Sequence, residues 1–386
     1  MIAVGRVLLG SCGNQVRLRH PGSPFRRLYL SLGQESALRP SKSNLCSTST
    51  PAEMSDSNER LTVSVIIPVR NDPEGVDRVV RCLERQTLSA DHFEVIVSDD
   101  GSSPDLAPRP ASSLIRVRTV NGPPTNSYAA RNRAARRSRS AYLAFCDSDC
   151  QPEPGWLEHA LEEPSPLRAG EVLLTAPERP TIWSLITIDM FLDQARCVRK
   201  HTAVTANLIV DRSRFLELRG FDETLPSGGD FDFVRRAAQA GYAPAHVPRS
   251  VVAHPTLDRG RALLRKVWFT NRWGATRTTR NRDPVQRTAL LYLVPVLGAA
   301  LARVHAERPM TRLHAPRLQA SGLRPQWWEH MLAMALVYGP VSLVAGSARL
   351  WGALDGLRRR RRGDRPGYLD ARESGAAPAA ATSKDR

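Results

Sequence analysis

The sequence predicts an α/β protein built on a doubly wound, mainly parallel sheet with helices on both faces. Two observations lead to this class. Short β-branched runs alternate with amphipathic helical patterns from about residue 61 onward, which is the pattern of such sheets. Two acidic clusters, Asp99-Asp100 and Asp147–Asp149, directly follow two of these runs. Ligands of open parallel sheets bind beyond the carboxyl ends of the strands, so both clusters are candidate site residues.

The composition is that of a chain that folds around a core. It has 386 residues, of which 41% are hydrophobic and 24% are charged. These values exclude a wholly disordered protein, a collagen-like fibre and a disulfide-stapled mini-protein. Six scattered cysteines form no C-x-x-C pair, so we expect reduced thiols rather than structural disulfides or a zinc site.

The net charge of +17 indicates an anionic partner, such as a nucleotide, a phosphate-bearing substrate or an anionic membrane surface. Nearly all of the basic residues are arginine, and a GC-rich genome produces the same bias. We therefore expect no nucleic-acid partner.

The individual strands and helices are predicted from hydrophobic periodicity. Val63–Ile67 is a β-branched run that ends at Pro68, which is typical of a buried strand. Apolar residues then recur at helical spacing over about 74–86. The same reasoning predicts strands at 93–97, 115–120, 141–145, 205–210 and 247–254, and helices at about 126–138 and 232–240.

The C-terminal third is predicted to hold apolar and amphipathic helices. Residues 257–287 are rich in Arg and Trp, which suits either a membrane-surface helix or a helix packed over the site. Two uncharged segments follow at 288–302 and 331–348, and the second reaches the length of a membrane-spanning helix. Arg358–Arg362 would form its cytoplasmic flank. The alternative is a pair of buried helices in a soluble domain.

These patterns divide the chain into five predicted regions. The first is a disordered leader, either a transit peptide or sequence ahead of a true start at Met54. The last is a disordered basic tail. The regions are 1–59 (leader), 60–256 (sheet domain), 257–287 (basic amphipathic helix), 288–357 (membrane-associated helices) and 358–386 (tail).

The strongest chemical signal is Asp147-Ser148-Asp149, which places two carboxylates at one strand end. Two like charges this close favour a cation between them, and Mg²⁺ or Mn²⁺ binds one or two carboxylates together with substrate phosphates. A solvated turn is the alternative. The phosphate-binding motifs G-x-G-x-x-G after the first strand and G-x-x-x-x-G-K-[ST], and the G-x-S-x-G elbow of hydrolases, are all missing from the sequence.

Two further clusters allow a functional and a structural interpretation. Asp99-Asp100 precede Gly101, so their carboxylates could accept hydrogen bonds from a nucleobase or ribose, or simply form an Asp-Gly turn. Asp230 follows Gly228-Gly229 before a helix, so it could be a general base or the N-cap of that helix.

Taken together and in order, six motifs resemble the family 2 glycosyltransferases, which are inverting enzymes with the GT-A fold. The likeness covers about 61–256. The motifs are Val63-Ser-Val-Ile-Ile-Pro-Val-Arg-Asn71, Val97-Ser-Asp-Asp-Gly-Ser-Ser103, Ala130-Arg-Asn132, Tyr142-Leu-Ala-Phe-Cys-Asp-Ser-Asp149, Gly229-Asp-Phe-Asp232 and Val251-Val-Ala-His254.

The resemblance implies roles for residues on the donor side. Asp100 would contact the base, with Asp99 supporting it, and Arg131 would lie near the diphosphate. Asp149 would be the more direct metal ligand of the D-x-D pair with Asp147. Pro68 and Asn71 would lie beside the nucleotide. His254 would lie near the metal, and a structural role is equally open for it.

On the acceptor side the resemblance implies that Asp230 is the general base. The family often has Glu where this chain has Gly229, so Asp232 stays open as an alternative base or as a substrate-binding residue. Arg70 is the second departure, because an aromatic residue is common there. No Q-x-x-R-W signature of processive synthases is present, so we expect single transfer.

The function implied is metal-assisted, inverting transfer of a hexosyl-type sugar from a nucleoside-diphosphate-sugar to a hydroxyl of a glycan or lipid-linked acceptor. We expect it at the cytoplasmic face of the cell membrane, in the synthesis of cell-envelope polysaccharide, with the C-terminal apolar segments as the attachment. The alternatives are a sugar nucleotidyltransferase and a non-catalytic, membrane-associated nucleotide-binding or scaffold protein.

Overall fold

A computed structural model describes residues 61–106, 114–280, 327–364 and 366–369 of the chain. Its elements in chain order are β1 (Val63–Val69), α1 (Pro73–Leu83), η1 (Ala90–His92), β2 (Phe93–Asp99), β3 (Arg116–Asn121), α2 (Ser127–Arg137), β4 (Tyr142–Phe145), β5 (Gln151–Pro152), α3 (Trp156–Leu161), β6 (Leu167–Thr175), α4 (Ile182–Met190), α5 (Gln194–Val198), η2 (Thr205–Asn207), β7 (Leu208–Asp211), α6 (Arg212–Glu217), α7 (Gly229–Gln239), β8 (Ala245–Pro255), α8 (Gly260–Arg280) and α11 (Trp327–Arg361).

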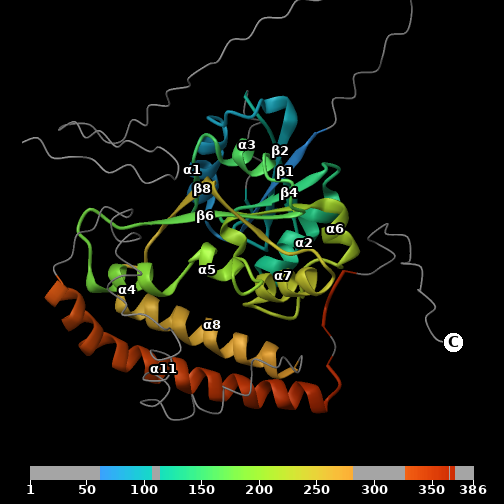
Figure 1. Ribbon diagram of the computed structural model, residues 1–386. Coiled ribbons are helices and arrows are strands. Elements are labelled where there is room, and N and C mark those ends of the chain that lie inside the picture. The colour runs from blue at the N-terminus through green and yellow to red at the C-terminus, as the bar shows by residue number, and fades with distance from the viewer. Residues whose placement is uncertain (1–60, 107–113, 281–326, 365, 370–386) are drawn as a thin grey trace, which may run out of the picture. The chain divides into compact units, whose positions relative to one another are not determined.

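The strands form one eight-stranded sheet of order β3-β2-β1-β4-β7-β6-β8-β5 (Figure 1). Strands β3, β2, β1 and β4 are mutually parallel, and β6 is parallel to β8. Strand β7 runs antiparallel to β4 and β6, and β5 runs antiparallel to β8. The predicted class, an α/β fold on a mainly parallel sheet, is therefore confirmed.

Each face of the sheet is covered by helices. Alternate residues of a strand point to opposite faces, so a single strand contributes to the packing on both. Val63, Val65 and Ile67 of β1 pack with α1 and α3 in one apolar cluster. Ile66 of the same strand packs with α2, α6 and α7 in a second cluster. Strands buried on both faces have continuous apolar runs, which is why β1 and β2 were visible in the sequence.

The second cluster contains a group of packed rings that fixes the positions of α2 and α7. Phe221 contacts Tyr128, Phe145, Phe215 and Phe233, with ring centroids 5.1–5.4 Å apart. Aromatic pairs at this separation stabilise a core beyond the area that they bury. Tyr128 at the start of α2 and the first turn of α7 are thus held against each other.

The strand predicted at 205–210 is shorter than expected. Residues 205–207 form the 3-10 turn η2, and β7 begins only at Leu208. The Asn207 side chain donates to the carbonyl oxygens of Glu171 on β6 and Ser250 on β8, both at 2.9 Å. A side chain that bonds neighbouring strands in this way competes with regular strand pairing.

Helices α8 and α11 lie side by side and are joined to the sheet domain by contacts at both ends of α8 (Figure 1). Near its start, Leu263 and Val267 pack with Ile186 of α4 and Val341 of α11. At its end, Arg280 forms a buried ion pair with Asp222. Among the described residues, no helix combines the length and the hydropathy needed to cross a membrane.

Residues 358–364 and 366–369 are more ordered than their composition predicts. Disorder is expected from 358 onward, but α11 continues to Arg361. Beyond it, Leu369 is buried in the core, and the amide of Gly367 donates to Asp222 (2.9 Å). The predicted leader 1–59, the uncharged segment 288–302 and the rest of the tail lie outside the described residues.

Candidate active site

The predicted site residues follow the carboxyl ends of three adjacent parallel strands. Asn71 follows β1, Asp99 and Asp100 lie at the end of β2, and Asp147 and Asp149 follow β4. Parallel strands present their carboxyl ends at the same edge of a sheet, where open sheets bind ligands. Pro68 is buried within β1, in register with Ser98, one residue before the strand ends.

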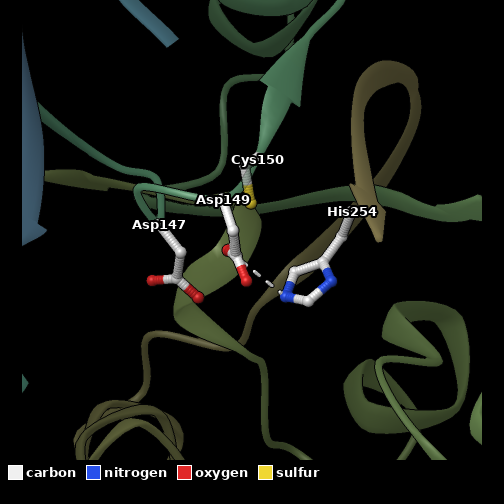
Figure 2. Close-up of side chains that lie close together, drawn as sticks. All are labelled: Asp147, Asp149, Cys150 and His254. Atoms are coloured by element: carbon white, nitrogen blue, oxygen red, sulfur yellow. Dashed lines mark ion pairs between the residues drawn. The ribbon is translucent and has the colours of Figure 1, made fainter. Parts of the chain in front are cut away.

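Four potential ligand residues meet at this edge. One ligand atom from each of Asp147, Asp149, Cys150 and His254 lies within 4.8 Å of all the others. Figure 2 shows these side chains, with an ion pair of 3.5 Å between Asp149 Oδ1 and His254 Nε2. The sequence-based set Asp147, Asp149 and His254 is thus brought together, although β8, which carries His254, is distant from β4 in the chain.

The donor chemistry of this group fits a hard divalent cation. His254 Nδ1 lies 2.8 Å from the carbonyl oxygen of Pro255, which can only accept, so Nδ1 carries the proton and Nε2 faces Asp149. Burial raises the pKa of Asp149; His254 lowers it and the like charge of Asp147 raises it further. A cation bound among these atoms would offset that repulsion.

Cys150 does not belong to this donor set in chemical terms. Its thiol is buried. A hydrogen bond with Cys146, followed by burial, raises its pKa well above the usual value. The raised pKa keeps the thiol protonated. Because only a thiolate is a good metal ligand, the carboxylates and the imidazole remain as the candidate ligands.

Arg131 connects this cluster to the helix α2. Its guanidinium pairs with Asp147 and stands 5.5 Å from the centre of the Tyr128 ring. Arg131 is only 3% exposed, and its Nε has no hydrogen-bond partner among the described residues. A buried guanidinium with donor capacity to spare beside a metal-type cluster suits an anionic ligand such as a diphosphate.

Asp230 lies in the first turn of α7 and is hydrogen-bonded to the same helix α2. Tyr128 Oη donates to Asp230 Oδ1 at 3.0 Å, and the amide of Phe231 donates to the same oxygen at 2.9 Å. Burial raises the pKa of Asp230, while these hydrogen bonds lower it. Burial likewise raises the pKa of Tyr128, so its hydroxyl remains a donor.

The ring of Tyr128 explains why position 229 carries no side chain. A Cβ at position 229 would lie 2.9 Å from the Tyr128 ring, which is too close for any side chain. This residue departs from the motif of the related family because an aromatic ring occupies the space that a Glu side chain would need.

Asp232 has a different environment from Asp230. Its carboxylate accepts from Arg236 at 2.9 Å and from Tyr368 at 3.4 Å, and it is 4% exposed. Asp232 is thus held by an ion pair within α7. Asp230 is instead bonded to Tyr128, whose ring also lies against the guanidinium of Arg131. The geometry favours Asp230 over Asp232 as the base, and both roles stay predictions.

The loops after β1 and β2 are bonded to each other. Asp99 Oδ1 accepts from the amide (3.0 Å) and hydroxyl (2.6 Å) of Ser102, whose oxygen accepts from the amide of Asn71 (2.9 Å). Asp99 therefore shapes the loop that carries Asp100. Asp100 accepts from the amide of Thr125 at 3.0 Å, and burial raises its pKa.

Three charged or polar residues near the site were not identified from the sequence. They are Tyr128, which bonds Asp230; Lys266, whose charge acts on Asp149; and Arg277, which adjoins Gly228. Tyr128 lies three residues before Arg131 and hence on the same side of α2, a signal that could have singled it out. No local pattern distinguishes the other two from the many basic residues of α8.

The chain was compared with known proteins. The family model described as glycosyl transferase family 2 matches residues 64–176. Glycosyltransferase AglE of Haloferax volcanii is 30% identical over 215 residues, which are 53% of this chain and 70% of that protein. The pre-mycofactocin glycosyltransferase of Mycobacterium tuberculosis is 29% identical over 234 residues, 57% of this chain and 48% of that protein.

A solved structure shares the fold. The mannosyltransferase PcManGT from Pyrobaculum calidifontis, in complex with GDP-Man and Mn²⁺, superposes with a TM-score of 0.50 at 19% sequence identity. The similarity covers 76% of this chain and 88% of that one. At this level of identity the likeness concerns the fold, and it agrees with the GT-A architecture that the motifs imply.

Proposed function

Because the chain belongs to glycosyltransferase family 2, we propose that it transfers a sugar, with inversion, from a nucleoside-diphosphate-sugar to a hydroxyl of a glycan or lipid-linked acceptor. One observation carries this proposal. A continuous series of contacts runs from the cation-type cluster through Asp147, Arg131 and Tyr128 to Asp230. This series supports a single site that would hold the leaving diphosphate and take the acceptor's proton.

The donor side would bind the nucleotide through the loops after β1 and β2 and the cluster after β4. Asp149, Asp147 and His254 would hold Mn²⁺ or Mg²⁺, which supplies positive charge against the departing diphosphate. Arg131 adds a buried guanidinium beside it. The solved mannosyltransferase of the same fold binds GDP-Man and Mn²⁺, which supports a donor of this chemical class.

The acceptor side would use Asp230 as the general base. As the acceptor oxygen bonds to the anomeric carbon, its proton passes to the Asp230 carboxylate and the nucleoside diphosphate leaves from the opposite face. Such a single displacement inverts the anomeric centre. A base works best when its pKa is drawn toward the working pH, and burial acts on Asp230 in this direction.

We also propose that the protein works at the cytoplasmic surface of the cell membrane, attached through α11. Leucines and a tryptophan of α11 recur at helical spacing and are exposed, which is unusual for large apolar side chains outside an interaction surface. Arg358–Arg361 end the same helix, and such charge favours anionic lipid. The exposed residues are Leu343, Leu350, Trp351, Leu354 and Leu357.

The experiment that tests the catalytic proposal combines binding with turnover. The thermal stability of the full chain is measured with UDP, GDP and dTDP, each with and without Mn²⁺. One nucleoside diphosphate is expected to stabilise the protein only with the cation, because a ligand that binds the folded state raises its stability. The matching nucleotide-sugars are then tested as donors.

Asp230→Asn is expected to bind that nucleotide as the wild type does but to lose transfer by about 10²–10⁴-fold, the usual contribution of a general base. Full turnover by this variant would remove Asp230 from the mechanism. A protein stabilised by no nucleotide would instead be the non-catalytic scaffold, and one that consumes nucleoside triphosphate and releases pyrophosphate would be the nucleotidyltransferase.

A further inference from the structure

A buried arginine from α8 lies beside the general base without a role in the reaction described above. Arg277 is 6% exposed, and its Nε has no hydrogen-bond partner among the described residues. A buried donor without a hydrogen-bond partner is costly, so this nitrogen is available to a group that the protein chain itself does not provide.

The reserved donor faces the start of α7. Nε of Arg277 is the nearest atom to the position that a Cβ of Gly228 would take, at 3.7 Å. Gly228 is the N-cap of α7, with a left-handed backbone (φ 80°) and no capping side chain. The amide of Phe231 is bonded to Asp230, which leaves the amides of Gly229 and Asp230 as donors of the first turn, and the helix dipole adds positive potential there. The guanidinium of Arg277 and the backbone amides at the start of α7 are therefore both close to Gly228.

Burial lowers the pKa of Arg277, and the nearby carboxylates of Asp232 and Asp230 act against this shift, but each of them already has a partner of its own. Asp232 is paired with Arg236, and Asp230 is hydrogen-bonded to Tyr128. Burial and then the like charge of Arg235 lower the pKa of Arg277. Two guanidinium groups that repel each other next to an uncapped helix favour an anion between them.

This position is separate from the diphosphate end of the site. The α8 cation that acts on the metal-type cluster is Lys266. Lys266 and Arg277 are eleven residues apart on α8, about 16 Å along the helix. Arg277 is instead influenced by Asp230 and Tyr128. If Asp230 is the base, as proposed above, Arg277 lies where the acceptor enters.

We propose that Arg277, together with the first-turn amides of α7, binds a phosphate group carried by the acceptor substrate. A guanidinium offers two parallel donors to a tetrahedral oxyanion, and the start of a helix is a common phosphate site. The phosphate would anchor the acceptor while its hydroxyl lies against Asp230. Such a group can belong to a lipid-linked acceptor or to a soluble phosphorylated sugar.

The test measures binding of four probes to the full chain by calorimetry: farnesyl phosphate against farnesol, and glucose 6-phosphate against glucose. The wild type is expected to prefer one phosphorylated probe at least tenfold over its alcohol, and the pair that shows this identifies a lipid or a soluble source. Arg277→Gln should weaken binding of the preferred phosphorylated probe by about 10- to 100-fold, the effect of losing a hydrogen bond between charged groups, and so abolish the preference.

The matched control is Arg265→Gln, which removes an exposed arginine from the same helix and should leave every affinity within about twofold. Arg277→Gln should unfold close to the wild-type temperature, because the buried Nε that it removes has no hydrogen-bond partner among the described residues. Arg277→Lys keeps the charge without the planar fork and provides a second folded variant, with an intermediate loss expected.

The proposal is overturned if the wild type shows no preference for phosphate or if Arg277→Gln retains it. It is also overturned if Arg277→Gln weakens nucleoside-diphosphate binding as much as phosphate binding, since Arg277 would then serve the donor. Failure of the catalytic proposal looks different: no nucleotide would bind to the wild type, whereas the phosphate preference and its dependence on Arg277 would still be measured.

Discussion

The hydroxyl of Tyr128 joins Asp230, the proposed general base, to the loop in front of it. It donates to Asp230 Oδ1 at 3.0 Å and accepts from the amide of Gly228 at 3.1 Å. Its ring occupies the space above Gly229. A single side chain therefore orients the carboxylate, the helix start and the glycine pair, which makes it a positioning residue for the reaction.

Tyr128→Phe is expected to lower kcat by about tenfold, the effect of one hydrogen bond to a charged group, with the fold retained. The Tyr128 hydrogen bond lowers the Asp230 pKa, so its loss raises that pKa. Because the base must be ionised, activity is lost as the pH falls through this pKa. The acid limb of the pH–rate profile should therefore move to higher pH in the variant.

The control for this prediction is Tyr242→Phe. Tyr242 donates to Glu217 in an exposed pair at 3.2 Å and follows the C-terminal end of α7, opposite the end that carries Asp230, so its loss should leave the profile unchanged. An acid limb that stays in place in Tyr128→Phe would show that Asp230 is not the titrating base.

Asp149→Ala is expected to abolish the Mn²⁺-dependent stabilisation by nucleoside diphosphate and to lower transfer by more than about 100-fold, because a bound cation contributes several kcal/mol to such reactions. Cys150→Ala is the matched variant within the same group of four residues. Its thiol is protonated, so the metal response should survive. Loss of the response in Cys150→Ala alone would reverse this assignment of ligands.

At the scale of single residues, the sequence predicted the aspartates but not their partners. Asp99, Asp147 and Asp149 follow apolar runs, so their location at strand ends could be inferred from neighbours in the chain. Tyr128 is 102 residues from Asp230, and Arg277 reaches Gly228 from another helix. Contacts of this kind depend on how elements pack, which a single sequence does not display.

Among the elements, α2 connects the parts of the site. Arg133 reaches the end of β2 through Asp100, Arg131 pairs with Asp147, and Tyr128 bonds Asp230. These three residues lie within two turns of one helix, with β1, β2 and α7 around it. The alternation of strands and helices was predictable because each has its own hydrophobic period. The packing that aligns α2 with α7 depends on the ring cluster and was not.

The pairing of α8 with α11 depends on glycine. A Cβ at Gly356 would lie 2.6 Å from the carbonyl oxygen of Thr276. Gly356→Ala is therefore expected to separate the helices locally and to lower the free energy of unfolding by about 1–3 kcal/mol, as overpacking does. Thermal unfolding and hydrogen exchange of α8 amides measure this.

Gly274→Ala is the control on the partner helix. Among the described residues, a Cβ at Gly274 would meet no atom within 4 Å, so alanine should be neutral or stabilise α8 by up to about 1 kcal/mol through its higher helix propensity. Equal destabilisation by both substitutions would mean that the two helices do not pack closely at Gly356.

For the whole molecule, the proposed attachment to the membrane depends on the exposed apolar row of α11. Leu350→Glu combined with Trp351→Glu should reduce flotation with vesicles containing anionic lipid by about tenfold or more, since each large apolar side chain contributes roughly 1.5–3 kcal/mol when it leaves water. Leu114→Glu, which changes an apolar residue of 62% exposure near β3, should leave flotation unchanged. Equal flotation of the α11 variant and the wild type would refute attachment through α11.

The fold class and the candidate donor site were predictable, but the arrangement of the C-terminal third was not. Apolar length suggested membrane-associated helices over 288–357, with buried helices as the alternative, and in the structure α11 packs one side against α8 and ends in arginines. Its residues are apolar on both the packed and the exposed sides, so hydropathy could not separate protein contact from lipid contact.

Asp222 is completely buried and is bound by two distant parts of the chain. The guanidinium of Arg280 at the end of α8 pairs with it, and the amide of Gly367 beyond α11 donates to it. Eight residues later the same segment reaches Asp230. An enzyme shortened before residue 366 would retain every aspartate of the sheet, yet it would lose one of the two anchors of the segment leading to its base. Removal of the residues from 366 onward should therefore slow turnover before it lowers the unfolding temperature of the sheet.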